Sequence, residues 1–247
     1  ALPISPLAGC GGNSGSGSAA AGSDYTIGVL QLTEHSALDA ANDGFVKAIK
    51  ESGLKVKIDQ KNAQNDQSTC KSIADKFVGD NVNLIYAIAT PAAQAAAGAT
   101  ADIPIVGCAI TDYAASGLVQ DNDKPGTNVT GASDLTPVAE QLEMMQKVLP
   151  DVKKVGLLYC TAESNSDVQI KAAEKELDKL GLEYTDFTVS SSNEIQSVVE
   201  SAVGKVDALY SPTDNTIAAG ASQVGQICKE NKLPFVTGEE GMCMAGG

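Results

Sequence analysis

The sequence predicts an α/β fold made of two successive lobes, each a parallel sheet flanked by helices. Short apolar runs rich in β-branched residues alternate with segments whose apolar residues recur at helical spacing. A polar connection with Gly and Pro, roughly residues 112 to 134, interrupts this alternation, which then starts again. Regular β–α alternation is typical of a doubly wound parallel sheet, and its restart indicates a second one.

The first lobe is predicted to contain four strands with helices between them. The strands are the runs YTIGVLQL (25–32), LKVKI (54–58), VNLIYAIA (82–89) and IPIVGCAI (103–110). The helices are a segment from about Leu38 to Gly53, then STCKSIADKFVGD (68–80) and PAAQAAAGA (91–99). Proline suits the start of the last helix because it lacks an N–H that the first turn leaves unpaired.

The second lobe repeats this order. Apolar residues at helical spacing run from Val138 to Leu149 and from Ile170 to Gly181, and further helices are expected around 193–203 and over 215–231. The strands are VKKVGLLY (152–159), LEYTDFTV (182–189), VDALYS (206–211) and LPFVTG (233–238). We therefore assign residues 24–123 to the first lobe, 124–134 to a crossover and 135–247 to the second lobe.

The first 23 residues are not predicted to belong to either lobe. An apolar piece ends in Leu-Ala-Gly-Cys, which resembles the lipobox of a bacterial lipoprotein signal. Residues 1–9 are then the remnant of a signal peptide, Cys10 is the lipidated residue, and 10–23 form a flexible tether rich in Gly, Ser and Ala. The alternative is that Cys10 is an ordinary thiol. The expected location is outside the cytoplasm, on a bacterial cell membrane.

The charge of the chain restricts its partners. The 247 residues carry a formal net charge of −14, which disfavours binding to nucleic acid or to an anionic membrane surface. All 17 basic residues are lysine, so an anion must be held by Lys, hydroxyls or backbone N–H groups rather than by a guanidinium fork. Besides Cys10 there are five cysteines, without the close spacing of a zinc site, and we favour buried free thiols over a disulfide.

Polar residues follow the predicted strands, at the edge where ligands bind in open α/β sheets. The eight turns are 33–36, 62–66, 90–93, 111–113, 160–166, 190–194, 211–215 and 238–242. Helix capping explains some of them, and Ser36, Ser68 and Ser166 are predicted caps. None of the eight turns contains a lysine. Carboxylates beside free N–H groups suit a zwitterion such as an α-amino acid, whose ammonium meets an acid and whose carboxylate meets helix N-termini.

Catalytic motifs do not appear in the sequence. There is no Gly-x-Ser-x-Gly, no Gly-x-Gly-x-x-Gly and no phosphate-binding Gly-Lys-Ser/Thr loop, so neither an enzyme nor a bound cofactor or metal is expected. His35, the one histidine, lies in the first turn, and it is either a structural residue or a ligand contact.

The turns resemble those of a known family, the substrate-binding lipoproteins of bacterial ABC importers for tryptophan, tyrosine and related amino acids. The matching stretches are EHSALDAANDGF, NAQND, AIATPAAQA, TNVTGASDLTPVAEQLE, ESNSDVQ, SPTDNTIAAG and GEEGM. The resemblance implies a type I periplasmic binding protein with two Rossmann-like lobes, a monomer that delivers its ligand to an ABC permease. It also implies a further strand and helices, so the chain is expected to be truncated within its C-terminal lobe.

Carried over by residue, the resemblance places ligand contacts on both lobes. The first lobe contributes Glu34, His35, Ser36, Thr90, Pro91, Thr111 and Asp112. The second contributes Glu163, Ser164, Asn165, Ser166, Asp214, Asn215, Glu239 and Glu240. We expect Asp214 to bind the ammonium, and the turn at 164–166 together with Thr90 to bind the carboxylate. An aromatic ligand is expected to stack on Tyr86, Tyr113, Tyr159 or Tyr210 if these reach the pocket.

Two features of this chain depart from the family pattern, and two alternative functions remain open. Tyr113 stands where relatives commonly have proline, and Cys160-Thr161 replaces a more polar pair. A receptor for a sugar or nucleoside is the alternative with the same fold, although the low aromatic content weighs against it. A ligand-sensing ectodomain is the alternative from another class, whereas a DNA-binding regulator would need a basic helix-turn-helix where the tether lies.

Overall fold

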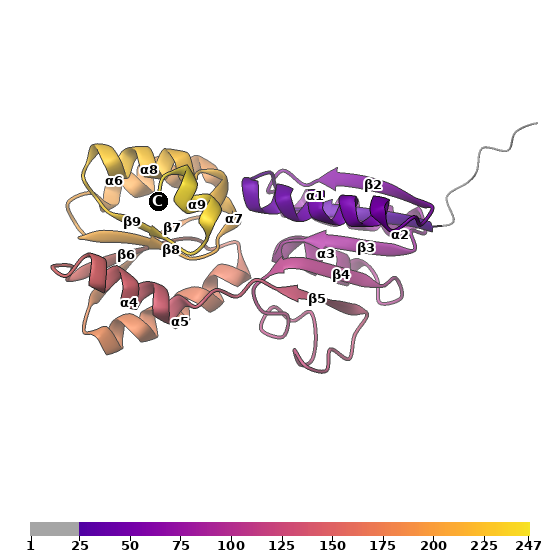
Figure 1. Cartoon of the computed structure of the whole chain (residues 1–247), viewed down its shortest axis with the longest axis horizontal. Coiled ribbons are helices and arrows are strands. Elements are labelled where there is room, and N and C mark those ends of the chain that lie inside the picture. Colours follow the sequence, from indigo (N-terminus) through magenta and orange to yellow (C-terminus); the bar gives the residue numbers. More distant parts are fainter. Residues whose placement is uncertain (1–24) are drawn as a thin grey trace, which may run out of the picture.

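The computed structural model describes residues 25–247, which form two α/β lobes side by side (Figure 1). The first lobe contains β1 (Tyr25–Gln31), α1 (Ser36–Glu51), β2 (Val56–Asn62), α2 (Gln67–Gly79), β3 (Leu84–Ile88), α3 (Thr90–Ala99), β4 (Ile105–Ile110) and β5 (Val129–Ser133). The second contains α4 (Val138–Val148), β6 (Lys154–Cys160), α5 (Ser164–Leu180), β7 (Glu183–Val189), η1 (Ser192–Glu194), α6 (Ile195–Ala202), β8 (Ala208–Ser211), α7 (Asn215–Ala219), α8 (Ala221–Glu230), β9 (Phe235–Thr237) and α9 (Glu240–Ala245).

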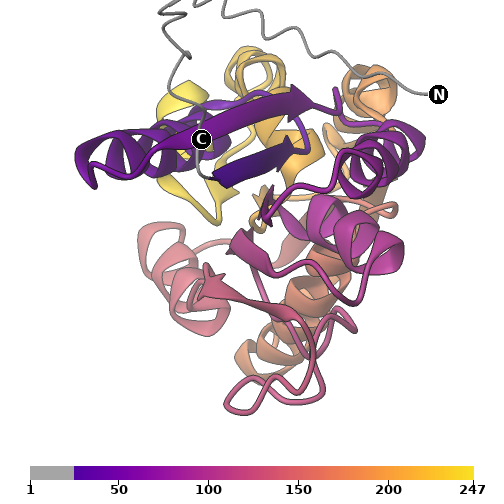
Figure 2. The ribbon, with the colours of Figure 1, turned by 90° about the vertical axis from the view of Figure 1, so that its right-hand side faces the viewer.

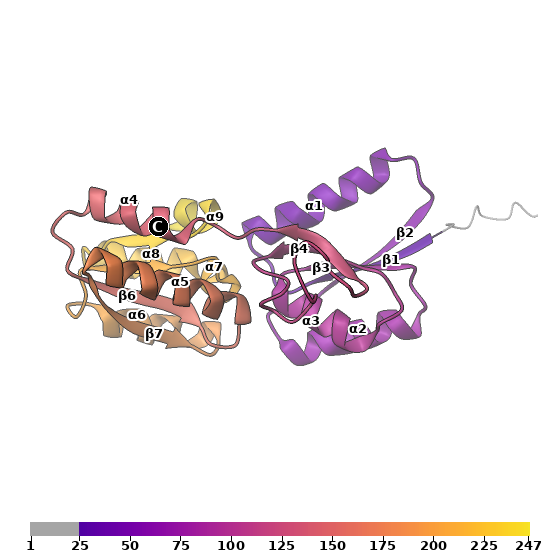
Figure 3. The ribbon, with the colours of Figure 1, turned by 90° about the horizontal axis from the view of Figure 1, so that it is seen from below.

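Both sheets are parallel throughout. The first has the strand order β2-β1-β3-β4-β5, and Figure 2 shows its strands one below another from β2 in dark purple to β5 in pink. The second has the order β7-β6-β8-β9. In the first lobe α1 covers one face of the sheet and α2 and α3 cover the other (Figure 3). In the second lobe α4 and α5 lie on one face, and α6 and α8 on the other (Figure 1).

The first sheet has five strands, one more than the sequence predicts. Strand β5 lies within residues 124–134, the segment expected to be a plain crossover. The sequence signal is weak because only Val129 of its five residues is buried. Gly131 cannot be replaced by a larger residue without a clash, because a Cβ there would lie 2.1 Å from the carbonyl oxygen of Gly107 and 2.2 Å from the hydroxyl of Tyr113. That hydroxyl donates a hydrogen bond to the carbonyl of Ala132 at 3.1 Å.

The predicted helix over 215–231 is two helices, α7 and α8, separated at Gly220. A Cβ on Gly220 would lie 2.5 Å from the side chain of Ile195 in α6. A larger residue at this position would have to displace the end of the Ile195 side chain. The break leaves α7 as a short helix at the edge of the second sheet that faces the first lobe (Figure 1).

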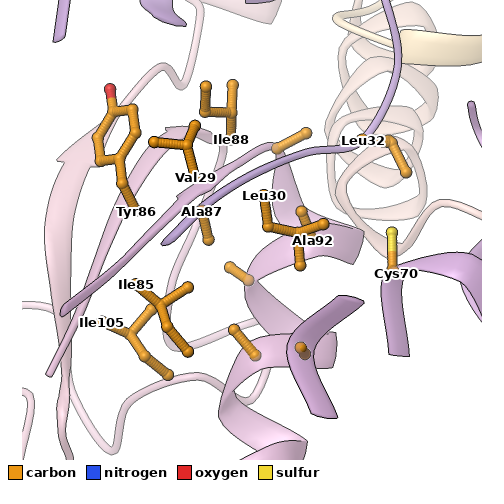
Figure 4. Packing of buried hydrophobic residues seen from close by; sticks show 14 of the residues in the cluster. Val29, Leu30, Leu32, Cys70, Ile85, Tyr86, Ala87, Ile88, Ala92 and Ile105 are labelled. Carbon is orange, nitrogen blue, oxygen red and sulfur yellow. The ribbon is translucent and has the colours of Figure 1, made fainter. Parts of the chain in front are cut away.

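The core of the first lobe comes from residues that alternate along the central strands. Val29 pairs in register with Tyr86, and Leu30 pairs with Ala87. Figure 4 shows Val29, Tyr86 and Ile88 on one side of the strands and Leu30 and Ala87 on the other. Each fully buried aliphatic side chain contributes on the order of 1.5–3 kcal/mol to folding. The packing fixes the strand ends that form the crevice described below.

The three serines predicted as N-caps lie inside their helices instead. The capping residues are His35 for α1, Asp66 for α2 and Glu163 for α5. The carboxylate of Asp66 accepts from the backbone N–H of Thr69 at 2.6 Å, and the hydroxyl of Ser68 donates to the same oxygen at 2.6 Å. The helices α1, α2 and α5 begin one, two and three residues earlier, respectively, than the serine pattern suggests.

We predict that Gly131→Ala destabilises the protein, whereas Gly44→Ala in α1 stabilises it. The first change places a methyl group against a backbone carbonyl that cannot move away, at a cost of about 1–3 kcal/mol. At Gly44 no atom lies within 4 Å of the added Cβ, so the gain in helix propensity of about 0.5–1 kcal/mol remains. Urea unfolding of both variants checks this; equal stability of Gly131→Ala and wild type would contradict the close approach.

Candidate ligand-binding crevice

The carboxyl ends of the two sheets face each other, and five hydrogen bonds join the lobes there. In the turns before α1 and α2, the Nε2 atom of His35 lies 3.2 Å from Oδ1 of Asn215, and Asn65 donates to the Thr216 hydroxyl at 2.9 Å. The remaining bonds run from Gln67 to the carbonyl of Ala162 (2.8 Å), from Gln94 to the Ser164 hydroxyl (3.1 Å) and from Gln169 to the Thr111 hydroxyl (3.5 Å).

All five bonds join uncharged groups, apart from the titratable imidazole. No ion pair between residues 25 and 247 crosses from one lobe to the other, because every one found lies within a single lobe. Each neutral hydrogen bond contributes only about 0.5–1.5 kcal/mol net. The contact between the lobes is therefore specific in geometry without being strong.

Two buried carboxylates hold the start of α7. Oε1 of Glu163 accepts from the N–H and the hydroxyl of Thr216, both at 2.8 Å, and Oε2 accepts from the N–H and side-chain amide of Asn215 at 3.1 and 2.6 Å. Oδ1 of Asp214 accepts from the N–H of Ile217 at 2.8 Å. The first three N–H groups of α7 are thus all bound by acids.

Asp214 is 2% exposed and has only neutral partners. Its second oxygen, Oδ2, accepts from the Ser166 hydroxyl and from the N–H of Cys160, both at 2.7 Å. Burial, reinforced by the negative charge of Glu163, raises the pKa of Asp214 to about 7, although the hydrogen bonds oppose this shift. A cation placed beside Asp214 and Glu163 would offset both the cost of burying a carboxylate and the repulsion between the two negative charges.

A cavity of about 280 Å³ opens between the lobes next to these acids, a volume near the lower end for small-molecule sites. Its lining residues are His35, Ala37, Leu38, Cys108, Ala109, Asp134, Thr136, Thr213, Asp214, Asn215, Ala218 and Glu239. The set combines three carboxylates with small apolar walls, and it contains no lysine. A second cavity of about 260 Å³, on the α2 and β7 side of the crevice, has more polar walls.

Helix N-termini at the crevice fall into two groups. Helices α2, α7 and α9 are capped by the carboxylates of Asp66, Asp214 and Glu239. The capping residues of α1, α3 and α5 make no side-chain capping bond. Uncapped N-termini keep their N–H groups and positive dipole ends available to an anion. The side chain of Gln94, in the second turn of α3, contacts Ser164 at the start of α5, so these two helices meet across the crevice.

Unusual backbone and unpaired polar atoms mark the same region. Ala89, before α3, and Ala109, in a register shift of β4, are non-glycine residues with φ of 83° and 55°. Such conformations are unfavourable and cluster at ligand sites. The hydroxyl of Thr90 and Oδ1 of Asn165 are buried without a partner among the described residues. Buried polar groups normally have partners, so these atoms indicate where a ligand's polar groups belong.

The structure brings most of the predicted site residues to the crevice. Ser36 is among them, because its hydroxyl lies directly against Gly241 of the other lobe. A Cβ added to Gly241 would be only 2.5 Å from the hydroxyl oxygen of Ser36. Glu34 and Glu240 are exposed outside both cavities, and Glu34 lines a surface hollow with residues such as Lys61. Asp112 orders its own loop by accepting from the N–H of Ala115 at 2.9 Å and the Asn122 amide at 3.0 Å, which lowers its pKa.

Several crevice residues were not predicted from the sequence. Gln94 and Gln169 lie inside helices, one and three residues beyond the turns that the pattern of strand ends selects. Gln169 is fully buried, and its amide donates to the Thr213 carbonyl at 3.1 Å and accepts from the Thr213 hydroxyl at 2.7 Å. A glutamine on the apolar face of α5, among Ile170 and Ala173, is the signal that could have found it.

Comparison with known proteins now identifies the type of protein. A family model described as ABC transporter substrate binding protein matches residues 26–247. The chain belongs to this family. The predicted fold, two Rossmann-like lobes of a type I periplasmic binding protein, is confirmed by the solved structures that it resembles. ABC substrate-binding proteins are binding proteins rather than enzymes, and they act outside the cytoplasm.

Three similar proteins are informative, two because their ligand is named and one because its structure is ligand-free and open. A tyrosine-binding protein of Clostridioides difficile (strain R20291) is 42% identical over 255 residues, which cover 99% of this chain and 74% of the relative. An ABC domain from Streptococcus pneumonia in complex with L-Trp is 40% identical, with a TM-score of 0.88 over 91% of this chain and 77% of that chain. A ligand-free, open substrate-binding protein from Clostridium difficile is 45% identical, but its TM-score is 0.61, over 88% and 75%. The substrate-binding protein described here therefore has the lobe arrangement of the complex rather than the open form.

The described residues contain neither a metal-chelating cluster nor a membrane-spanning helix. Within residues 25–247, no group of three or more His, Cys, Asp or Glu side chains is arranged to bind a metal ion. None of the helices in this range has both the length and the apolar character needed to cross a bilayer. The five cysteines in this range are free; Cys70, Cys160 and Cys228 are buried, Cys108 is half-buried and Cys243 is exposed.

We predict that Asp214 makes the ligand-free protein less stable as the pH rises from about 4 to about 7. Its pKa in the folded protein lies above the unfolded value, so the stability that its proton contributes is complete at low pH and is lost toward pH 7. Asp214→Asn removes this slope, which amounts to roughly 1 kcal/mol per pH unit.

Urea unfolding between pH 4.5 and 7.5 measures the slope, and Asp207→Asn is the control. Backbone N–H groups of Lys153 and Lys154 lower the pKa of Asp207, so its contribution is lost only at acidic pH below this range. Asp207→Asn should therefore lower stability without changing the slope. A slope equal to that of wild type in Asp214→Asn would show that this carboxyl does not titrate in the range.

Proposed function

We propose that the protein binds a free aromatic amino acid between its lobes and delivers it to an ABC importer. The observation that carries the proposal is the cavity of about 280 Å³, in which carboxylates and apolar walls occur together without a lysine. The printed names of the relatives, a tyrosine-binding protein and a complex with L-Trp, support the same ligand class.

The charged ends of such a ligand have complementary partners in the crevice. The ammonium lies beside Asp214, where it supplies the positive charge that the buried acids lack. The carboxylate lies between the uncapped N-termini of α3 and α5, where the Thr90 hydroxyl has no other partner. This arrangement explains how a chain without arginine recognises a carboxylate.

The side chain of the ligand packs against aliphatic walls rather than on aromatic rings. Neither crevice cavity is lined by a tyrosine. Tyr86 is stacked on Phe45 with ring centroids 3.9 Å apart, and the Tyr210 hydroxyl donates to Gln141 at 2.7 Å inside the second lobe. The apolar contacts come from Ala37, Leu38, Ala109 and Ala218. Shape and burial, rather than stacking, are then the source of affinity for an aromatic ring.

We further propose that Cys10 carries a lipid that tethers the protein to the outer face of the cell membrane. This residue and the rest of the segment 1–24 lie outside the described residues. The proposal rests on the Leu-Ala-Gly-Cys sequence and on the extracytoplasmic location of the family. The protein acts as a monomer, because one crevice between its own lobes suffices for one ligand.

The test of the function is titration calorimetry with the twenty amino acids, several sugars and several nucleosides. We expect tyrosine or tryptophan to bind most tightly, and amino acids with small side chains to bind weakly because they leave the apolar walls unfilled. Affinity for a sugar or nucleoside with none for any amino acid would overturn the proposal.

Thr90→Val separates binding from stability. We predict about tenfold weaker binding of the amino acid, because the ligand carboxylate loses a hydroxyl donor. The ligand-free variant should be as stable as wild type or slightly more stable, because that hydroxyl has no partner to lose. Ser116→Ala is the matched control, since its hydroxyl is likewise buried and unpaired but belongs to the segment between β4 and β5 rather than to the uncapped N-terminus of α3. Unchanged affinity in Thr90→Val would remove Thr90 from the site.

A further inference from the structure

His35 carries an unpaired nitrogen at the ligand cavity. The residue lines the cavity of about 280 Å³, and its Nδ1 atom is buried without a hydrogen-bond partner among the described residues. Its other ring nitrogen, Nε2, lies 3.2 Å from Oδ1 of Asn215 in the opposite lobe. An unpaired buried nitrogen destabilises the ligand-free protein unless something bound there supplies a partner.

The hydrogen-bond network assigns the tautomer of this imidazole. The carboxylate of Glu163 only accepts, so the amide group of Asn215 that faces it at 2.6 Å must be the NH₂. Oδ1 of Asn215 then faces His35 and also only accepts. Nε2 of His35 must therefore carry the hydrogen, which leaves Nδ1 of the neutral ring as a lone-pair acceptor.

We propose that Nδ1 of His35 accepts a hydrogen bond from the side-chain O–H or N–H of the bound amino acid. His35 thereby selects tyrosine or tryptophan over phenylalanine, which has no such donor. This inference rests on the proposed function and adds a specificity-determining residue to it. Among the acids that line the cavity, Asp214 has both oxygens bound to groups of its own lobe, and Glu239 has both bound to N–H groups at the start of α9, so neither presents a donor to Nδ1. Asp134 is an acceptor when ionised and does not satisfy an acceptor nitrogen either.

The selectivity comes from the cost of leaving the nitrogen unpaired. A phenylalanine side chain fills the same apolar walls but keeps Nδ1 away from water and from any donor. A site that hydrogen-bonds a substrate hydroxyl rejects the analogue without it far more strongly than an apolar pocket rejects a missing methylene. We expect the wild-type protein to bind tyrosine or tryptophan at least about tenfold more tightly than phenylalanine.

Two substitutions separate the roles of the two nitrogens. His35→Gln retains an amide that reaches toward Asn215 but loses the acceptor at the position of Nδ1, whereas His35→Asn retains a polar atom near that position and loses the contact between the lobes. By calorimetry, His35→Gln should bind tyrosine and tryptophan about tenfold more weakly and phenylalanine within about twofold of wild type. His35→Asn should weaken the binding of all three amino acids while keeping the preference for tyrosine and tryptophan over phenylalanine.

Nitrogen NMR supplies a readout that does not depend on a variant's stability. The sequence contains one histidine, so ¹⁵N-histidine labelling gives a single imidazole. The ligand-free protein should show the tautomer protonated on Nε2. Tyrosine should move the Nδ1 signal toward lower frequency, as hydrogen bonding to a lone pair does, and phenylalanine should leave it unchanged.

The outcomes separate this inference from the function on which it rests. If His35→Gln weakens the binding of phenylalanine as much as that of tyrosine, the inference is wrong. Nδ1 then contacts the ligand's ammonium or has only a structural role. The same conclusion follows if phenylalanine and tyrosine move the Nδ1 signal equally. If the wild-type protein binds none of the three amino acids, it is the proposed function that fails.

Discussion

Glu163 is the residue on which the geometry of the crevice depends. One of its oxygens holds Thr216 and the other holds Asn215, and these two residues make the contacts of α7 with Asn65 and His35 in the first lobe. A carboxylate that is 3% exposed and binds four donors on one short helix fixes both side-chain orientations. Without it, two of the five interlobe bonds would lose their defined partners.

The distribution of acids decides which helix N-termini remain available. Glu163 precedes α5 but binds α7, so α5 starts without a side-chain cap. Asp214 and Glu239 occupy the starts of α7 and α9. Negative potential is thereby concentrated around the cavity in the second lobe, while α3 and α5 keep free dipole ends where they meet. In a chain whose basic residues are all lysine, backbone dipoles are the positive groups that can recognise a carboxylate within the crevice.

The fold and the position of the crevice could be predicted from sequence, because β–α alternation implies parallel sheets and their carboxyl ends hold the turns. Strand β5 was missed because its glycine and small exposed residues carry no hydrophobic pattern. Asp214 was predicted to face the crevice, but not to bind the N–H of Cys160, because the register of neighbouring loops is set by tertiary packing. Gln94 and Gln169 were missed because they lie within helices, beyond the turns that follow the strands, and their long side chains reach across to the other lobe.

The weakness of the contact between the lobes gives the ligand control over closure. The five hydrogen bonds between the lobes contribute only about 0.5–1.5 kcal/mol each, so the contacts of a bound ligand are comparable in size to the contact between the lobes. A zwitterion that contacts Asp214 in one lobe and Thr90 in the other stabilises the closed state alone. A ligand shifts the equilibrium between open and closed states only when it binds one of them more tightly. The resemblance in lobe arrangement to a relative bound to L-Trp, rather than to an open relative of higher identity, fits a crevice whose geometry is already that of the bound state.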